Sequence, residues 1–215
     1  MRPAAAPFYN SGMSRVRADD YEDKRQGILD AAAVLFARSG YANVKMADIA
    51  RACGASKSML YHYFPRKEDV LFQIMRDQVQ SYLAATEEVL ARPGTPEERL
   101  RQFVTLWVRK STSARARITV LMYEFKFLPA RQRAVVSEVA RRLIDRVVEL
   151  VLQVNPSLKD GGRARPRTYT LLLFGLLNWT EVWFRSTGPI GPDEMAAMIH
   201  ALFLHGLPAA PRPGG

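Results

Sequence analysis

The stretch KMADIARACGASKSMLYHYFPRK, residues 45–67, decides the fold because it has the pattern of two short helices joined by a tight turn. The turn is Cys53-Gly54-Ala55, where glycine suits a backbone that needs positive φ. Ser56 follows it and is a good N-cap for a second helix over residues 57–63. The small or apolar side chains fall where two such helices pack together: Ile49, Ala50, Cys53, Ala55 and Leu60. This spacing predicts a helix-turn-helix motif.

The charge of this stretch distinguishes a DNA-reading motif from an ordinary buried helix corner. Residues 45–67 contain five lysines or arginines and one acid, Asp48, with polar and aromatic donors on the second helix. A buried corner would not gather such groups, whereas a phosphate backbone attracts them. We expect contacts to phosphate from the first and last lysines of the stretch. The residues expected to contact DNA are Lys45, Lys57, Ser58, Tyr61, His62 and Lys67.

The same residues carry a family resemblance. Asp48-Ile49-Ala50, Gly54, Ser56-Lys57, the run from Leu60 to Phe64 and Lys67-Glu68 resemble the signature of the TetR family of bacterial transcriptional regulators. The resemblance implies an all-helical homodimer with a small N-terminal DNA-binding domain and a larger C-terminal effector-binding domain. Members often have threonine near the start of the first motif helix and Gly-Thr in the second, where this chain has Lys45 and Ser58-Met59. The operator sequence therefore does not transfer from a relative.

Composition agrees with a two-domain chain that meets a polyanion. The 215 residues are 48% hydrophobic, enough for one small and one ordinary core, and the net charge is +10. No run approaches the roughly 18 apolar residues of a membrane span, and no secretory signal is visible, so we expect a cytoplasmic protein. The single cysteine, Cys53, excludes an intrachain disulfide; it is either an inert packing residue or a redox sensor.

Helical spacing continues through the rest of the chain, and no segment alternates with period two, so an all-α fold is expected. The domain boundaries that we predict are a disordered arm at 1–20, a helix-turn-helix DNA-binding domain at 21–67, a ligand-binding and dimerisation domain at 68–207, and a disordered tail at 208–215. A first helix should brace the motif, and a long helix should connect the domains. The expected helices outside the motif cover 23–39, 66–91, 96–110, 115–127, 130–154, 165–186 and 192–205.

Enzymatic chemistry has no visible constellation in the sequence. His62 belongs to the reading helix, and His200 and His205 are five residues apart, which does not align them on one helical face. Zinc-ligand spacings and glycine-rich phosphate loops are not found, so we expect no catalytic residue, no metal and no cofactor. The alternative is a helical enzyme or an acyl-binding module that has no DNA-binding role.

Large apolar side chains converge in the C-terminal part, as a ligand cavity between helices requires, although a plain core is the alternative for each of them. The expected ligand-binding residues are Phe103, Trp107, Met122, Phe125, Asn178, Trp179 and Trp183. The run LLLFGLLNWTEVWFRSTGPIGPDEM, residues 171–195, is similar to a segment of the TetR branch that represses aromatic-acid and fatty-acid catabolism. That resemblance implies release by acyl-CoA thioesters.

Basic residues are available to hold the phosphates of a CoA outside such a pocket, although a solvated surface is the other reading of these charges. They are Arg109, Lys110, Arg115, Arg117, Arg131 and Arg133.

The last two expected helices each carry an apolar stripe that a monomer would not easily cover. These stripes are Leu173, Leu177, Thr180 and Phe184 on one helix, and Met198, Leu202 and Phe203 on the other. We expect a symmetric homodimer built from these helices, with two reading helices on a roughly palindromic double-stranded operator. The sequence thus predicts a ligand-responsive repressor that a small apolar effector releases from DNA.

Overall fold

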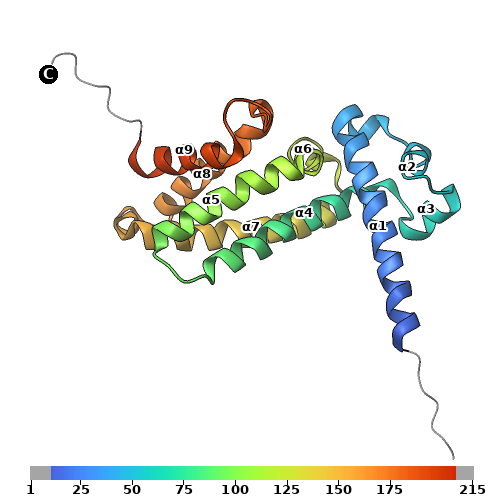
Figure 1. Ribbon diagram of the computed structural model, residues 1–215, viewed down its shortest axis with the longest axis horizontal. Coiled ribbons are helices and arrows are strands. Elements are labelled where there is room, and N and C mark those ends of the chain that lie inside the picture. The colour runs from blue at the N-terminus through green and yellow to red at the C-terminus, as the bar shows by residue number, and fades with distance from the viewer. Residues whose placement is uncertain (1–10, 207–215) are drawn as a thin grey trace, which may run out of the picture. The chain divides into compact units, whose positions relative to one another are not determined.

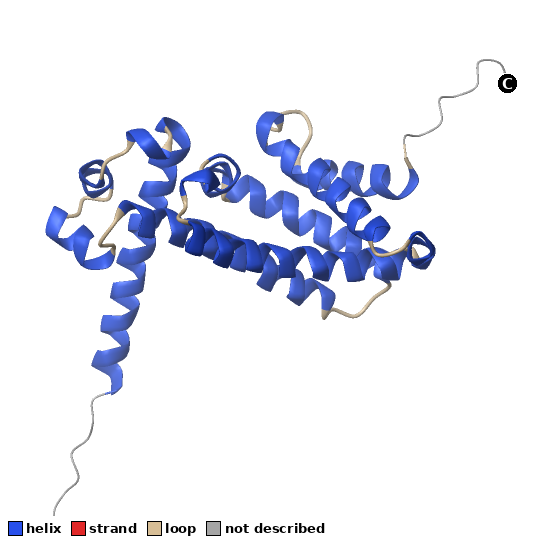
Figure 2. Cartoon of the chain, turned by 180° about the vertical axis from the view of Figure 1, so that it is seen from behind, coloured by secondary structure: helices blue, strands red, loops and turns tan. Residues whose placement is uncertain are grey.

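The computed structural model describes residues 11–206, and all regular structure in that range is helical (Figures 1 and 2). The expected all-α fold is confirmed. The elements are α1 (Ser11–Ser39), η1 (Tyr41–Asn43), α2 (Met46–Ala52), α3 (Lys57–Tyr63), α4 (Lys67–Leu90), α5 (Pro96–Ser113), α6 (Arg115–Tyr123), η2 (Phe125–Phe127), α7 (Ala130–Val154), η3 (Pro156–Gly161), α8 (Ala164–Trp183) and α9 (Pro192–His205).

The chain forms two compact units, which divide after Val70. The helix-turn-helix pattern lies in the first unit, and the helices from residue 71 onward form the second. The expected tail at 208–215 and the first half of the expected arm lie outside the described residues. Among residues 11–206, no helix has both the length and the apolar character that crossing a membrane requires.

Helix α1 begins at Ser11, earlier than the start at residue 23 that we expected, so residues 11–20 are helical and not part of a disordered arm. The apolar spacing that we used begins only at Ile28, which is buried. Before that point the helix carries exposed ion pairs between neighbouring turns, such as Lys24 with Asp20 at 2.7 Å. Such pairs add a few tenths of a kcal/mol each without any apolar stripe.

The core of the first unit explains the sequence pattern of the motif. Helix α1 packs on α2, and α2 packs on α3. Phe36, Ile49 and Leu60 are fully buried between them, and Ala50 is small enough to let the helices approach. Burial of each large apolar side chain contributes about 1.5–3 kcal/mol. These contacts hold α3 so that the face opposite Leu60 is exposed to solvent.

The turn of the motif has the geometry that its residues predict. Gly54 adopts a φ of 66°, which a side chain would strain. The Ala55 amide donates to the Ala50 carbonyl at 2.9 Å and closes the turn. The Ser56 hydroxyl accepts from the Met59 amide at 3.1 Å, so α3 begins at Lys57 as expected.

The second unit is organised around α5, which packs against α6, α7, α8 and α9. Its start is fixed by a capping box: the Glu98 amide donates to the Thr95 hydroxyl, and the Thr95 amide donates to the Glu98 carboxylate. Trp107 of α5 stacks on Tyr82 at 4.1 Å between ring centroids and meets Phe174 edge-on at 4.9 Å. Helices α7 and α8 form a packed pair joined by η3 (Figure 1).

Two predicted helices end earlier than expected. The 115–127 helix breaks after Tyr123, and the remaining residues form the short η2. Helix α8 ends at Trp183, because Phe184 is already extended, and the Arg115 guanidinium donates to the carbonyl oxygens of Glu181, at 2.8 Å, and Phe184, at 3.4 Å. A cation at this position satisfies carbonyls that the helix end leaves without partners.

Candidate nucleic-acid interface and ligand cavity

A basic hollow of about 370 Å³ lies in the first unit, between the η1–α2 segment and α3. Four of the six residues expected to contact DNA line it: Lys45, Lys57, Tyr61 and Lys67. Tyr61 is 49% exposed, although it is a large aromatic residue. The hollow therefore combines three lysines with an aromatic donor, a composition that suits phosphate and groove contacts.

The other two expected residues lie beside this hollow on α3. Ser58 and His62 are exposed, whereas Leu60 on the opposite face is fully buried. The His62 ring meets the Tyr63 ring edge-on at 5.7 Å, and Tyr63 stacks on Tyr21 of α1 at 4.6 Å. These ring contacts join the C-terminal turn of α3 to α1.

Lys67, for which we expect a phosphate contact, also forms hydrogen bonds within the protein. Its ammonium donates to the carbonyl oxygens of Tyr41, at 2.9 Å, and Val44, at 2.8 Å, and lies 4.1 Å from the centre of the Tyr41 ring. The lysine at the start of α4 thus fixes the loop that leads into α2. Sequence spacing placed Lys67 near the phosphates but did not reveal the carbonyl groups 23 and 26 residues upstream.

Cys53 stands in the turn of the motif, half-buried, and its thiol donates to the Ala50 carbonyl at 3.6 Å. A weak hydrogen bond within the motif agrees with the packing interpretation of this cysteine.

The second unit contains an apolar cavity of about 270 Å³. Its wall comes from α4, α5, α6, α7 and α8, and the Asn178 amide is a polar group among largely apolar side chains. The lining residues are Val79, Tyr82, Trp107, Ile118, Leu121, Met122, Ala140, Leu143, Ile144, Leu171, Phe174 and Asn178. Burial raises the pKa of the Tyr82 phenol, whose hydroxyl forms a hydrogen bond with that of Ser111 at 3.0 Å.

Three of the seven expected ligand residues line this cavity: Trp107, Met122 and Asn178. The other four do not. Phe103 is fully buried in the aromatic cluster behind the cavity, and Phe125 lies in η2. Trp179 and Trp183 are 62% and 53% exposed, on the outer face of α8.

From residue 171 to residue 183, helix α8 carries large apolar side chains on both its buried and its exposed face, so residue type alone does not separate the two faces. Sequence reasoning also missed the contribution of α7. Val136, Val139, Leu143 and Val147 are buried at helical spacing, and this pattern marks the α7 face beside Ala140 and Ile144. Tyr82 on α4 was missed because the connecting helix was assigned no role in ligand binding.

Three of the six cations that we expect to hold CoA phosphates form contacts within the protein. Arg109 forms a bidentate ion pair with Asp193, with both nitrogen–oxygen distances at 2.7 Å, and Arg115 caps α8. Lys110 donates to the Ser81 hydroxyl at 2.7 Å. These three cations therefore do not form the free phosphate-binding cluster that we expected. Burial raises the pKa of the Glu181 carboxyl, and the Arg115 charge partly lowers it.

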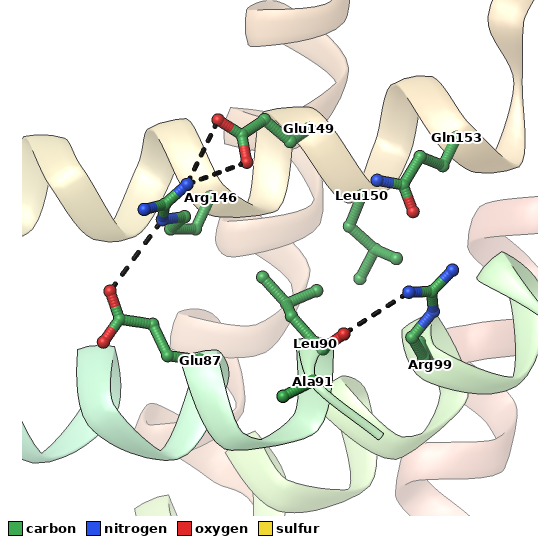
Figure 3. Close-up of a pocket in the computed structure, with 8 residues that line it drawn as sticks. All are labelled: Glu87, Leu90, Ala91, Arg99, Arg146, Glu149, Leu150 and Gln153. Carbon is green, nitrogen blue, oxygen red and sulfur yellow. Dashed lines mark hydrogen bonds and ion pairs between the residues drawn. The ribbon is translucent and has the colours of Figure 1, made fainter. Parts of the chain in front are cut away.

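Another hollow, of about 330 Å³, lies where α4, α5 and α7 meet (Figure 3). Figure 3 shows that its charged groups face one another: Arg146 pairs with Glu149 at 3.1 Å and with Glu87 at 3.8 Å. Arg99 donates to the Leu90 carbonyl at 3.3 Å. This polar lining suits an apolar acyl group less well than the α4–α8 cavity does.

Helices α8 and α9, which pack on each other, carry a row of exposed apolar side chains that we call the α8–α9 apolar face. It consists of Leu172, Trp179, Val182, Trp183, Met198 and Leu202. The stripe expected on α8 was wrong, because Leu173, Leu177, Thr180 and Phe184 are buried within this chain. On α9, Met198 and Leu202 are exposed as expected, whereas Phe203 is half-buried.

Family comparisons agree with this geometry in both units. Residues 28–74 match the description "Bacterial regulatory proteins, tetR family". Residues 93–207 match "Tetracyclin repressor-like, C-terminal domain". The chain belongs to the TetR family. It is a DNA-binding transcriptional regulator and not an enzyme.

Relatives of the TetR family resemble the chain over most of its length. A TetR-family transcriptional regulator from Bordetella parapertussis 12822 is 37% identical, with a TM-score of 0.83 over 88% of this chain and 100% of that one. The HTH-type transcriptional repressor KstR2 of Rhodococcus jostii RHA1 is 29% identical over 88% of this chain and 95% of its own. AibR, in complex with isovaleryl coenzyme A and operator DNA, shares the fold with a TM-score of 0.72 at 24% identity, over 83% and 97%.

Proposed function

We propose that this regulator is a ligand-responsive repressor that binds a palindromic operator as a homodimer and leaves it when a small apolar effector binds. The DNA-reading surface in this proposal is the exposed face of α3 with the hollow beside it. Lys57, Ser58, Tyr61 and His62 contact the DNA from α3, and Lys45 contacts phosphate. Leu60, on the opposite face, holds the helix to the core. The TetR relatives support the regulator role, and KstR2 supports repression.

The homodimer in this proposal forms through the α8–α9 apolar face. Helix α8 exposes two tryptophans, and α9, which packs on it, also exposes apolar side chains. Exposed apolar patches of this kind often mark protein–protein contacts. A two-fold axis through this face would pair each residue with the same patch on a second copy and cover both helices. The symmetry would also present two α3 helices to the two halves of a palindrome.

The effector in this proposal is an acyl-CoA thioester with an aromatic or alicyclic acyl group, which occupies the α4–α8 cavity. An apolar cavity of roughly 150 Å³ holds benzene, so 270 Å³ accepts one ring with a short extension. Asn178 and the Tyr82 side chain supply polar groups that can orient a thioester carbonyl. AibR, which shares the fold at 24% identity, supports the architecture only. The thioester class rests on the residue 171–195 segment and on the cavity.

One observation carries the coupling between ligand and DNA: α4 belongs to both sites. This continuous helix contributes Lys67 to the hollow of the first unit, and Val79 and Tyr82 to the cavity wall of the second. A ligand that contacts Tyr82 can favour one of two positions of α4. It changes the DNA affinity only to the extent that it binds one of these two conformations more tightly than the other. A tenfold loss of DNA affinity needs a preference of about 1.4 kcal/mol.

The test is a release experiment on DNA-bound protein. Duplex DNA selected by the protein from a random pool is labelled, and phenylacetyl-CoA, benzoyl-CoA and a long-chain acyl-CoA are titrated in turn. Release by a ring-bearing thioester supports the proposal. Release by a free acid or a cationic drug, with none by any thioester, assigns the effector to a different chemical class and leaves the DNA-binding role standing.

A further inference from the structure

Two hollows lie in succession along the α7–α8 pair. The apolar cavity uses Ile144 of α7 and Leu171 of α8. A second groove, of about 560 Å³, uses the next residue on α7, Asp145, and Arg167, one helical turn before Leu171 on α8. Since α7 and α8 pack against each other, the groove continues the same seam toward η3. An elongated ligand could occupy both hollows at once.

The chemistry of the two hollows is opposite. The second groove, which we call the η3 groove, carries three cations and one acid above a floor of Val148, Leu152 and Pro166; its charged residues are Asp145, Lys159, Arg163 and Arg167. Asp145 pairs with Arg167 at 2.7 Å. Within residues 11–206, Lys159 and Arg163 have no ion-pair partner, so two exposed cations remain available for an anion.

The spacing of the hollows fits one molecule. From Phe174 in the cavity to Arg163 in the groove, the α8 axis advances by about 16 Å, at about 1.5 Å per residue. In an acyl-CoA, about thirteen bonds separate the thioester sulfur from the nearest phosphorus. That chain is as long as about four extended residues, or roughly 15 Å.

We infer that the η3 groove binds the phosphate-bearing head of the effector while the acyl group occupies the α4–α8 cavity, an inference that rests on the proposed effector class. Lys159 and Arg163 hold the phosphates, and Arg167, at the junction, keeps its pair with Asp145. The apolar floor of the groove lies under the pantetheine arm. This assignment replaces the cations of α5 and α6 with Lys159 and Arg163, which have no ion-pair partner within residues 11–206.

Two probes separate the two halves of the site. Phenylacetyl-CoA carries both the acyl group and the phosphates, whereas S-phenylacetyl-N-acetylcysteamine carries the acyl thioester without them. Binding of each to the full chain is measured by calorimetry for the wild type and for the double variant Lys159→Glu/Arg163→Glu. A matched control, Arg101→Glu/Arg92→Glu, changes the same number of charges in a different basic hollow, formed by α5 and the loop before it.

We expect the Lys159→Glu/Arg163→Glu variant to bind phenylacetyl-CoA about tenfold more weakly or worse, because two charge-assisted contacts become repulsive. Its affinity for the truncated thioester should stay within about twofold. An equal loss of phenylacetyl-CoA affinity in the α5 control would overturn the inference, because the net charge of the protein and not the η3 groove would then explain the loss. Unchanged phenylacetyl-CoA affinity in the groove variant would also overturn it. Both outcomes leave the proposed function intact. If neither probe binds the wild type, the proposed effector class fails and the inference fails with it.

A cavity variant separates the acyl subsite in the same experiment. Ala140→Phe adds a ring to the cavity wall and should weaken both probes alike. Thermal denaturation confirms that each variant is folded. If Ala140→Phe weakened only phenylacetyl-CoA, the acyl group would not occupy the cavity, and the two-hollow assignment would be wrong.

Discussion

At the scale of single residues, Lys67 shows how a charge that suits DNA is used inside the protein. Its ammonium bridges two carbonyl oxygens of the η1 loop and faces the Tyr41 ring. Hydrogen bonds that involve a charged group contribute about 1.5–3 kcal/mol. We therefore propose that Lys67 affects DNA binding through the position of α2, by holding the loop that leads into it.

Replacement of Lys67 by alanine tests this role. We expect a loss of about 2 kcal/mol of stability, and hence a fall of several degrees in Tm, because two carbonyl groups lose their donor. Lys57→Ala is the matched control, since Lys57 is exposed and should affect DNA affinity but not Tm. Thermal denaturation and DNA titrations at several salt concentrations measure both effects. If Lys67→Ala left Tm unchanged but reduced the dependence of DNA affinity on salt concentration, Lys67 would be assigned to a phosphate contact instead.

Glu181 gives a second prediction at this scale. Burial raises the pKa of its carboxyl, so the folded protein holds the proton at a pH where the unfolded chain has lost it. The contribution of Glu181 to the free energy of unfolding is therefore fully present below the pKa of the carboxyl in the unfolded chain. It falls as pH rises from about 4 through the pKa of the carboxyl in the folded protein. Glu181→Gln removes this dependence.

The Tm difference between the Glu181→Gln variant and the wild type should therefore grow with pH and favour the variant at neutral pH. Melting curves from about pH 4 to 7 measure it. A difference that is constant across this range would show that the carboxyl is solvated in the folded protein.

At the scale of elements, helix ends that carry a cap, a glycine turn or a proline were predicted better than helix faces. The turn at Gly54, the caps at Ser56 and Thr95 and the breaks at prolines define helix ends through short-range hydrogen bonds, which the sequence displays directly. Helix α7 has polar residues on one side, so its buried face follows from spacing. Helix α8 lacks that contrast, and only its tertiary neighbours decide that Leu173 faces inward and Trp179 outward.

The exposed face of α8 yields a prediction about assembly. Trp179→Glu/Trp183→Glu should convert a dimer into a monomer at micromolar concentration, because each dimer would bury four charges in an apolar contact. Light scattering after gel filtration measures the mass. Val34→Glu is the control, since Val34 is 56% exposed on α1, and it should leave the dimer intact. A wild type that is monomeric under these conditions would remove the homodimer.

At the scale of the whole molecule, five helices build the cavity, so its size could not be read from any one segment. The sequence correctly indicated that aromatic residues gather in the second unit. The lining residues come from segments far apart in the chain, such as Val79 of α4 and Ala140 of α7, which only the fold brings together. If the proposed effector occupies this cavity, the volume of about 270 Å³ limits the size of its acyl group.

This volume predicts a preference among thioesters. Phenylacetyl-CoA should release DNA at a concentration at least about tenfold lower than a long-chain acyl-CoA, because the longer chain exceeds the cavity. Ile144→Ala enlarges the cavity and should reduce that preference. Release curves for both thioesters with both proteins measure it. A wild type that responds equally to the two would place the acyl group outside the cavity.

We propose that effector binding and DNA binding are coupled through α4, and the coupling of two ligands is reciprocal. The most direct measurement is the affinity of the protein for phenylacetyl-CoA with and without saturating operator duplex. Our account predicts that the duplex weakens phenylacetyl-CoA binding by the same factor, about tenfold or more, by which the thioester weakens DNA binding. Equal affinity for the thioester in the presence and absence of operator DNA would contradict it.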